Sequence, residues 1–398
     1  MSLAELLSDS KGLSNFSGNA STCIRNYSIK EDAGAAATTV AGGLLPLANR
    51  GFANKNLQVT SGDHLNLLNA SATGSVMGAE IVSKVSFLLN DNRSTVGFAE
   101  PPRDEMNIKL YEGSVKASGS LGAVEWGKSL SLFGSSAKAC DVTPGAGFTA
   151  TEPAMQFKFT LPELTPGLKV DLALSNLASD NVSATVPSRI DLDANVHNVT
   201  STRNLGLEGK VSYDTGYGAV LNLEFLNNKT NGISVGVQEG TAVATPSPVP
   251  LAAGLSDKLK GLAGSIDVDM SGFTGCLGTA KTEGLGHLHP AVGGFEATAG
   301  ARKYKHTFGK VGYAMDASVV SVPLKFDINY GKTKQDGSKG THTAANLFKE
   351  NTRTGLCIGT PLSEDLSFDL CYDQYKTKNS AGLSNKMNVT SICGLYKF

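Results

Sequence analysis

Polar and apolar residues alternate with a period of two in many short segments of the chain. Residues 190–197 and 324–330 alternate without interruption. Such a period places the two kinds of residue on opposite faces of a β-strand. Gly, Asn, Asp, Ser and Pro between the segments supply turns, and we predict an all-β chain of about 16 strands (16–18). Further alternating segments are residues 155–161, 168–174, 207–213, 219–225, 266–270 and 366–372.

The polar face of these segments carries charged side chains, as at Asp191, Asp193 and Lys325. Such a face needs water, and the alternation leaves no second apolar layer for a β-sandwich core. Segments of about ten residues, joined alternately by short and long connections, are typical of outer-membrane barrels. Because every backbone polar group must be paired within lipid, such a sheet must close on itself. We therefore expect a closed antiparallel transmembrane β-barrel, with apolar residues facing lipid and charges facing a wet lumen.

The whole chain, residues 1–398, reads as a single barrel. Residues 1–20 are expected to form an N-terminal segment with a short helix at 2–8, and residues 21–398 the strands and loops. A short loop helix is expected at residues 256–262. This layout puts one long segment, 275–293, at the end where short turns are the rule. Either a further or divided strand lies between residues 295 and 322, or the rule fails here. The expected loops are residues 91–104, 135–153, 241–262, 275–293, 331–351 and 377–385.

Charge and composition narrow the class of protein. The formal net charge of −1, from 35 basic and 36 acidic residues, argues against a nucleic-acid partner, which would require a basic face. No apolar run approaches the roughly 18 residues of a transmembrane helix. The N-terminus has no basic region followed by a long apolar stretch, so we read it as the mature form of an exported protein rather than a signal peptide.

Both ends of the chain resemble the porins of the Gram-negative outer membrane. Phe398 is terminal and Tyr396 lies on the same strand face, an ending typical of that family. Residues 2–7, followed by a strand near residues 25–27, are similar to the start of mature porins, and residues 122–128 to the strand that precedes their inner loop. The resemblance implies long extracellular loops, one loop folded into the lumen, and Tyr396 and Phe398 as a signal for the barrel-assembly machinery. It also implies a homotrimer in contact with the lipid bilayer and lipopolysaccharide.

The expected inner loop departs from the porin pattern. Residues 135–153 lack the usual acidic motif, and their acids are Asp141 and Glu152. The candidates for a constriction are therefore Lys128, Asp141 and Glu152.

The resemblance implies a water-filled channel for passive diffusion of ions and small hydrophilic solutes. A pore selects by its width and by its lining charges. The polar faces of the clean strands carry ten acids and four bases, an excess that favours cations; alternatively, paired charges neutralise one another and the pore discriminates little. The predicted pore-lining residues are Lys158, Lys169, Asp171, Asp191, Asp193, Glu208, Lys210, Glu224, Asp267, Asp269, Lys325, Asp327, Asp369 and Asp373.

Two other functions remain open. One is a substrate-specific channel, narrowed by the N-terminal segment or by an inner loop. The other is a surface adhesin or receptor whose long loops do the binding. We expect no enzyme, because the sequence has no nucleophile elbow, no paired-His helix and no phosphate-cradling loop. His197 shares a face with Asn195 and Asp193, but no nucleophile on that strand completes a catalytic set.

Six cysteines occur without a C-x-x-C pair, which argues against a zinc knuckle. Cys357, Cys371 and Cys393 fall on the inward face of three successive expected strands. Pairing of the last two strands suggests a Cys371–Cys393 disulfide, while closure of the barrel brings Cys23 near Cys393; free thiols are the alternative. His287 and His289 alone are weak metal ligands, so we expect no metal and no cofactor.

Overall fold

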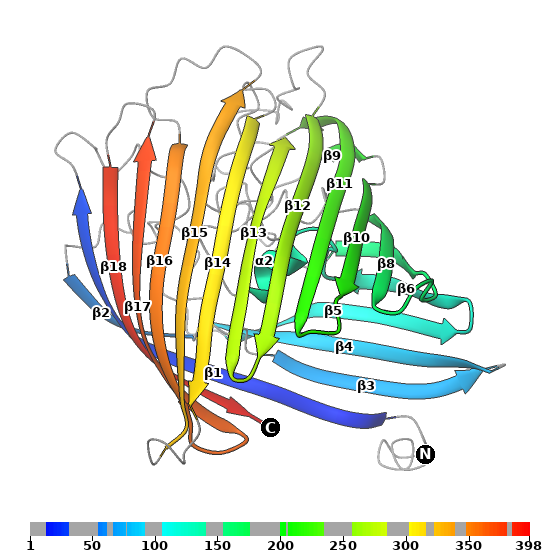
Figure 1. Cartoon of the computed structure of the whole chain (residues 1–398), viewed down its shortest axis with the longest axis horizontal. Coiled ribbons are helices and arrows are strands. Elements are labelled where there is room, and N and C mark those ends of the chain that lie inside the picture. The colour runs from blue at the N-terminus through cyan, green and yellow to red at the C-terminus, as the bar shows by residue number, and fades with distance from the viewer. Residues whose placement is uncertain are drawn as a thin grey trace, which may run out of the picture.

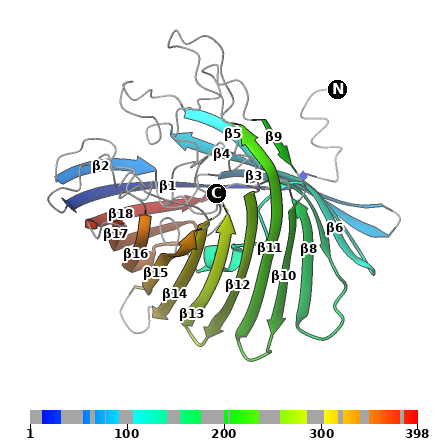
Figure 2. The same ribbon diagram turned by 90° about the horizontal axis from the view of Figure 1, so that it is seen from above.

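The computed structural model describes residues 13–31, 55–61, 67–76, 78–91, 106–140, 154–175, 200–203, 206–234, 257–284, 302–315, 322–338, 348–379 and 384–398. All the strands belong to one antiparallel sheet that curves round and closes (Figure 1, Figure 2). Within the described residues, no helix is long and apolar enough to cross a membrane. The elements are β1 (Leu13–Glu31), β2 (Lys55–Ser61), β3 (Leu67–Val76), β4 (Ala79–Asp91), β5 (Met106–Gly119), β6 (Gly122–Ser129), α2 (Ser135–Ala139), β7 (Ala154–Thr160), β8 (Leu168–Ser175), β9 (Thr200–Arg203), β10 (Gly206–Asp214), β11 (Ala219–Ser234), β12 (Asp257–Met270), β13 (Phe273–Gly284), β14 (Arg302–Met315), β15 (Leu324–Ser338), β16 (Phe348–Pro361), β17 (Leu366–Asn379) and β18 (Ser384–Lys397).

The eighteen strand segments occupy sixteen positions around the barrel. β2 and β3 pair with successive stretches of β1, and β9 and β10 pair with successive stretches of β11, so each couple fills one position. β1 also pairs with β18 along most of its length, which joins the first strand to the last. The predicted closed antiparallel barrel of about 16 strands is confirmed.

The outer face of the barrel is apolar across its middle. Phe273, Tyr313 and Phe326 stand directly opposite one another on β13, β14 and β15, and the rings of Phe273 and Tyr313 lie 4.4 Å apart between centroids. Leu277 and Ile328 lie higher on the same face and are largely exposed. An exposed band of apolar and aromatic side chains is what a lipid-facing surface requires.

The last residue of the chain, Phe398, is hydrogen-bonded to β1. The Gly18 N–H donates to the Phe398 carbonyl at 2.7 Å, and the Phe398 N–H donates back to the Gly18 carbonyl at 3.0 Å. A Cβ at Gly18 would overlap the Phe398 ring, so glycine here gives the terminal ring its place. Ile392, Tyr396 and Phe398 are exposed on the outer face, whereas Cys393 is buried inside.

The structure corrects several expected boundaries. β1 begins at Leu13, inside the expected N-terminal segment, and the helix expected at 2–8 lies outside the described residues. The helix expected at 256–262 is wrong because those residues from Asp257 onward belong to β12. The loop expected at 331–351 is shortened from both sides, by β15 to Ser338 and by β16 from Phe348.

The topological difficulty at residues 275–293 is resolved by two strands. β13 takes residues 273–284, within the expected loop, and β14 takes residues 302–315, within the stretch where a further strand was in question. The connection between β12 and β13 is therefore the tight turn at Ser271 and Gly272. Glycines obscured the alternation: Gly278 faces inward beside Phe308, whose ring occupies the space that a Cβ would need. Small and large inward residues therefore complement one another across these strands.

Candidate functional site

The inner face of the barrel carries the charges that the alternation predicted. Cross-strand register extends this face from strand to strand, starting at β10 and β11, whose inward side chains contact a segment inside the barrel. Asp191 and Asp193 lie outside the described residues. The predicted residues on the inward face are Lys158, Lys169, Asp171, Glu208, Lys210, Glu224, Asp267, Asp269, Lys325, Asp327, Asp369 and Asp373.

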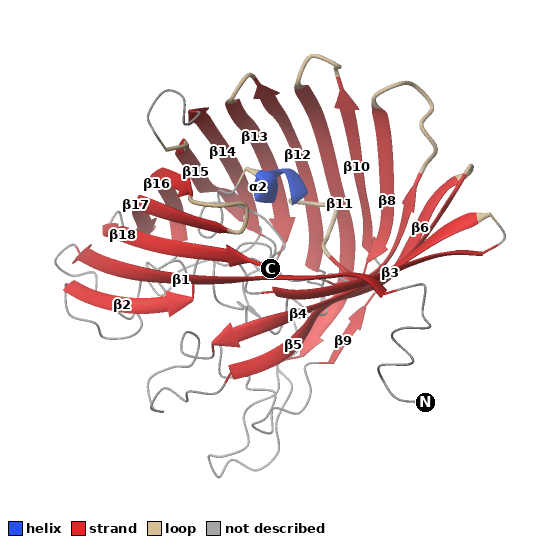
Figure 3. Cartoon of the chain, turned by 90° about the horizontal axis from the view of Figure 1, so that it is seen from below, coloured by secondary structure: helices blue, strands red, loops and turns tan. Residues whose placement is uncertain are grey.

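Residues 130–140, here called the inner segment, follow β6 into the lumen and include α2 (Figure 3). Its apolar side is buried against the inner wall formed by β11 to β14. Phe133 lies over Gly261, where any Cβ would collide with the ring. The inner segment thus covers one side of the lumen with a small packed core. That core consists of Phe133, Ala137, Cys140, Leu226, Ala263, Ala280 and Phe308, with Cys276 beside it.

Glu208 on β10 holds the start of the inner segment. One of its carboxylate oxygens accepts the backbone N–H of Leu132 at 2.9 Å and that of Phe133 at 3.2 Å. The Ser131 hydroxyl donates to the same oxygen. The wall therefore supplies the charge and the inner segment supplies the donors, so residues 131–133 are held at the wall without an acidic motif of their own.

Glu224 on β11 holds the first turn of α2 in the same way. It accepts the backbone N–H groups of Gly134 at 2.7 Å and Ser136 at 2.9 Å, together with the hydroxyls of Ser135 and Ser136. The Lys210 ammonium lies 3.4 Å from the same carboxylate. Charge-assisted hydrogen bonds of this kind are about twice as strong as neutral ones.

Glu208 and Glu224 correct the predicted pore lining. Both face inward as expected, but the residues are 0% and 1% exposed. Because the inner segment covers them, they do not meet pore water, and they position the segment instead.

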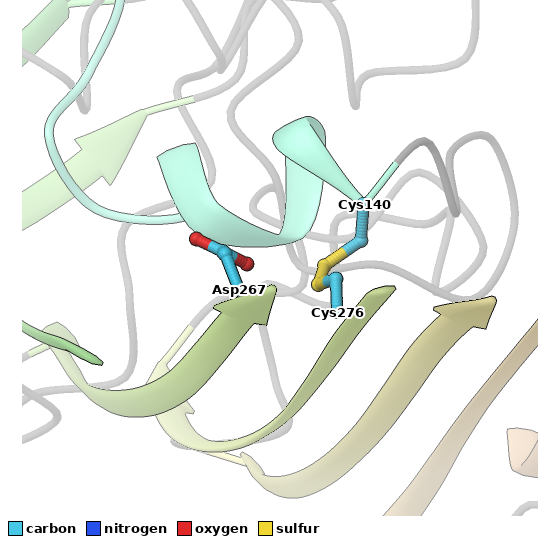
Figure 4. A group of neighbouring side chains, drawn as sticks. All are labelled: Cys140, Asp267 and Cys276. Atoms are coloured by element: carbon cyan, nitrogen blue, oxygen red, sulfur yellow. A yellow bond between two sulfur atoms is a disulfide. The ribbon is translucent and has the colours of Figure 1, made fainter. Parts of the chain in front are cut away.

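A disulfide between Cys140 and Cys276 joins the far end of the inner segment to β13 (Figure 4). Asp267 of β12 lies next to this bond, and the three side chains approach closely enough to resemble a metal site. Both sulfurs are already bonded to each other, so this group offers a metal the Asp267 carboxylate and no thiolate. Asp267 instead accepts a hydrogen bond of 2.7 Å from the Asn222 amide.

The predicted Cys371–Cys393 disulfide is wrong. Cys371 stands opposite Ser391 in the β17–β18 register. The disulfides are Cys357–Cys371, between β16 and β17, and Cys23–Cys393, between β1 and β18, each with Cα atoms 4.1 Å apart. The alternative proximity of Cys23 and Cys393 is confirmed, and it follows from closure of the barrel, which puts the two directly opposite.

Several inward acids are neutralised by neighbouring bases. Asp373 is bound by the Arg353 guanidinium at 2.9 Å, and both side chains are nearly buried. Asp327 lies 3.3 Å from the Lys325 ammonium and 3.6 Å from that of Lys310. Formation of these pairs reduces the excess negative charge that the sequence suggested.

The inward face also carries charges that were not predicted from the sequence. They belong to strands on which the alternation is weaker or to positions without clean neighbours. The cross-strand register adds the bases Arg25, Lys84, Lys116, Lys310 and Arg353 and the acids Glu80, Glu112, Glu125 and Asp214.

The structure describes one of the three residues predicted to form a constriction. Lys128 is wrong: its neighbours Gly127 and Ser129 face inward, so Lys128 faces outward with Trp126, and its ammonium contacts the Leu110 carbonyl at 3.4 Å. Asp141 and Glu152 lie outside the described residues. The constriction on this side is instead built from the inner segment itself.

No family model and no curated protein matches the sequence. Solved structures match over nearly the whole chain. The outer membrane channel DcaP of Acinetobacter baumannii has a TM-score of 0.63 at 11% identity, covering 96% of each chain. The anion-selective porin from Comamonas acidovorans has a TM-score of 0.56 at 13% identity, covering 96% of this chain and 99% of that one. OmpT of Vibrio cholerae, in a trimer form, has a TM-score of 0.56 at 11% identity, covering 97% of this chain and 99% of that one.

These likenesses define the fold. The chain has the fold of the outer-membrane porins, a closed antiparallel β-barrel.

Proposed function

We propose that the protein is a porin-type channel for passive diffusion of ions and small hydrophilic solutes across the outer membrane of a Gram-negative bacterium. The observation that carries this proposal is the inner face, which carries charged residues on most of the described strands. A charged face within a lipid-bounded barrel requires water. The inner segment lies against β10 to β14 and narrows the lumen from one side. Two of the similar structures are described as a channel and a porin, and we propose no enzymatic activity.

Liposome swelling tests this function. Purified barrel reconstituted into liposomes should admit small sugars at rates that fall steadily with solute size. Heat-unfolded protein inserted at the same ratio is the control. Equal swelling in the two preparations would refute the proposal.

We also propose a weak cation preference. Asp214, Asp267 and Asp269 gather on the inward face near the turns Thr215–Gly218 and Ser271–Gly272, and Asp269 is exposed. A mouth lined by carboxylates raises the local cation concentration. In a salt gradient across a planar bilayer, the reversal potential should favour K⁺, and the D214N/D269N variant should reduce this preference. An anion-favouring potential in the unaltered protein would contradict it.

A substrate-specific channel is the second candidate. The observation that favours it is the firm attachment of the inner segment through Glu208, Glu224 and the Cys140–Cys276 bond, since a fixed constriction can fit one solute. Concentration-dependent block of the ion current by a particular solute would distinguish it from general diffusion. The adhesin or receptor alternative depends on long loops that lie largely outside the described residues.

The proposed partners follow from the same proposal. We propose a homotrimer embedded in lipid bilayer and lipopolysaccharide, assembled by the barrel-assembly machinery through Tyr396 and Phe398. The exposed outward positions of both rings support the last point, and the trimer form of one similar structure supports the first.

A further inference from the structure

Three side chains with metal-binding atoms meet where the inner segment ends. Asp267 of β12 and Cys276 of β13 stand directly opposite each other in the strand register, and Cys140 reaches them from the inner segment (Figure 4). The two sulfurs and a carboxylate oxygen all lie within 4.8 Å of one another. Among the described residues, neither of the other two cysteine pairs has a third ligand at this distance. We call Cys140, Asp267 and Cys276 the ligand triad.

One oxygen of Asp267 is available for a ligand. Oδ2 accepts the hydrogen bond of 2.7 Å from the Asn222 amide, whereas Oδ1 is buried and accepts no hydrogen bond. A buried oxygen without a donor bears a desolvation cost, which a partner normally offsets. The bond from Asn222 fixes the direction of the carboxylate, as outer hydrogen bonds do for the ligands of metal sites. The wall therefore presents an oriented carboxylate to the end of the inner segment.

Neighbouring ammonium groups are engaged with other acids. Lys310 stands opposite Cys276 on β14, but its ammonium lies 3.6 Å from the Asp327 carboxylate. Lys210 binds Glu224 at 3.4 Å and donates to the Ser135 hydroxyl at 2.8 Å. The negative charge of the ligand triad is thus left to an added cation.

The sulfurs can bind a metal only after their disulfide is reduced, because the thiolate is the ligand. A small dithiol attacks the bond through a mixed disulfide. It supplies two electrons and two protons, closes its own disulfide, and leaves Cys140 and Cys276 as thiols. Cys276 is half-buried on the inward face, so such a molecule can reach the bond from the lumen. A divalent metal that binds the two sulfurs then releases both thiol protons.

The spacing of the ligand triad suits zinc. Zinc binds cysteine sulfur at about 2.3 Å in a tetrahedron, which puts two bound sulfurs roughly 3.8 Å apart. The Cα atoms of Cys140 and Cys276 are 5.6 Å apart, a distance from which rotation of the two side chains reaches that separation. Thiolates select zinc over calcium and magnesium, carboxylate is also a zinc ligand, and water would complete the tetrahedron.

We propose that the ligand triad is a zinc site of the reduced protein, which holds the end of the inner segment when the Cys140–Cys276 disulfide is open. The disulfide and the metal then attach the same residue of the inner segment to the same strand. The segment end comes loose only when the disulfide is reduced and the metal is absent. This site depends on the position of the inner segment and is independent of what passes through the lumen.

The test uses the full-length protein in detergent, reduced with dithiothreitol and freed of reductant in the absence of air. Native mass spectrometry counts bound Zn²⁺ over a series of metal concentrations. The C140S/C276S variant keeps the other two cysteine pairs and is the control for the sulfurs. D267N removes the carboxylate, and D369N is its matched control, because Asp369 stands opposite Cys393 as Asp267 stands opposite Cys276.

Folding of each variant is checked by heat-modifiable gel migration. In oxidised D267N, formation of the Cys140–Cys276 disulfide shows that the inner segment is in place. If D267N does not fold, the comparison of the oxidised and reduced unaltered protein with C140S/C276S still decides the outcome.

The reduced unaltered protein should bind one Zn²⁺ more than reduced C140S/C276S, and the oxidised protein should lack this ion. D267N should bind it at least ~10-fold more weakly, since even the loss of an outer hydrogen bond can cost that much, and D369N should bind it as the unaltered protein does. In single-channel recordings, reduction should make the current fluctuate more often. Added Zn²⁺ should return the fluctuations to the oxidised level in the unaltered protein and leave those of C140S/C276S unchanged.

Equal zinc uptake by the reduced unaltered protein and reduced C140S/C276S would overturn the proposal. Full zinc affinity in the oxidised protein or in folded D267N would also overturn it, as would equal weakening by D267N and D369N. Absence of conductance together with zinc uptake at the ligand triad would count against the proposed channel and leave the zinc site standing.

Discussion

Two buried carboxylates on the wall determine where the inner segment lies. Glu208 and Glu224 together accept the backbone N–H groups of Leu132, Phe133, Gly134 and Ser136. A buried carboxylate whose donors are removed bears a large desolvation cost, and so do donors left without an acceptor. These residues therefore act through the segment that they hold rather than by attracting ions.

The variant Glu224→Ala should release the first turn of α2. We expect a weaker attachment by about 2–4 kcal/mol, since several hydrogen bonds to a charged group are lost. In single-channel recordings the expected result is a higher mean conductance with larger current fluctuations. Asp327→Ala is the matched control, because that acid pairs with strand lysines. Identical noise in the two variants would show that Glu224 does not hold the segment.

Individual residues also show which features of the site could be predicted from the sequence. Period-two alternation is a property of single strands, so the inward orientation of residues such as Lys210 and Asp327 was predictable. The roles of Glu208 and Glu224 were not predictable, because their backbone partners lie 75 to 90 residues away in the sequence. Lys128 was misplaced since Gly127 and Gly122 gave its strand no clear pattern.

At the scale of elements, the inner segment is fixed at both ends. Carboxylates of β10 and β11 hold its start, and the Cys140–Cys276 bond holds its end on β13. Sequence indicated that a loop would enter the lumen only through resemblance to porins. The disulfide that fastens it was not predictable, because Cys276 lay in a strand read as a loop.

Removing this disulfide should loosen the constriction without opening the barrel. The C140S/C276S variant is expected to conduct, with more frequent current fluctuations, because the wall carboxylates still hold the start of the segment. The C357S/C371S variant removes a hairpin disulfide that lies away from the inner segment. Its current should fluctuate as often as that of the unaltered protein. If both cysteine variants show the same steady current, the tether has no effect on the pore.

The closing strand is the second element with a specific prediction. Phe398→Ala should lower the yield of folded barrel by several-fold, because the ring that packs over Gly18 and the outward apolar end are both lost. The measurement is the fraction of heat-modifiable protein in outer-membrane extracts. Phe368→Ala, an outward ring on β17, is the control. An equal loss of yield in the two variants would indicate a general packing effect rather than an assembly role.

At the scale of the whole molecule, the barrel is closed covalently as well as by hydrogen bonds. Cys23 and Cys393 are 370 residues apart in the sequence and directly opposite across the β1–β18 seam. Cys357 and Cys371, by contrast, are separated by 14 residues. In the chain-entropy description, a disulfide stabilises more when it closes a longer loop.

Loss of the seam disulfide should therefore cost more stability than loss of the hairpin disulfide. We expect C23S/C393S to lower the free energy of unfolding by about 5 kcal/mol and C357S/C371S by about 3 kcal/mol. Urea unfolding in detergent micelles, followed by the fluorescence of Trp126, measures both. A larger loss for the hairpin variant would contradict this account of the seam.

The overall class was predictable because closure is forced by physics once the strands are recognised: a sheet with one apolar face and one charged face can lie in lipid only as a ring. The exact order of strands was harder to predict, since β13 carries small inward residues, among them Gly278 and Ala280, beside the buried Phe308 of β14. Complementary packing across several strands leaves no signal within any one of them.

Single-channel conductance in a planar bilayer tests the central claim most directly. Each insertion of folded protein should raise the current by a step of uniform size. The conductance of each step should be ohmic and should rise in proportion to the salt concentration, as a water-filled lumen narrowed by a fixed inner segment requires. Folded, membrane-inserted protein that gives no conductance steps would contradict the account.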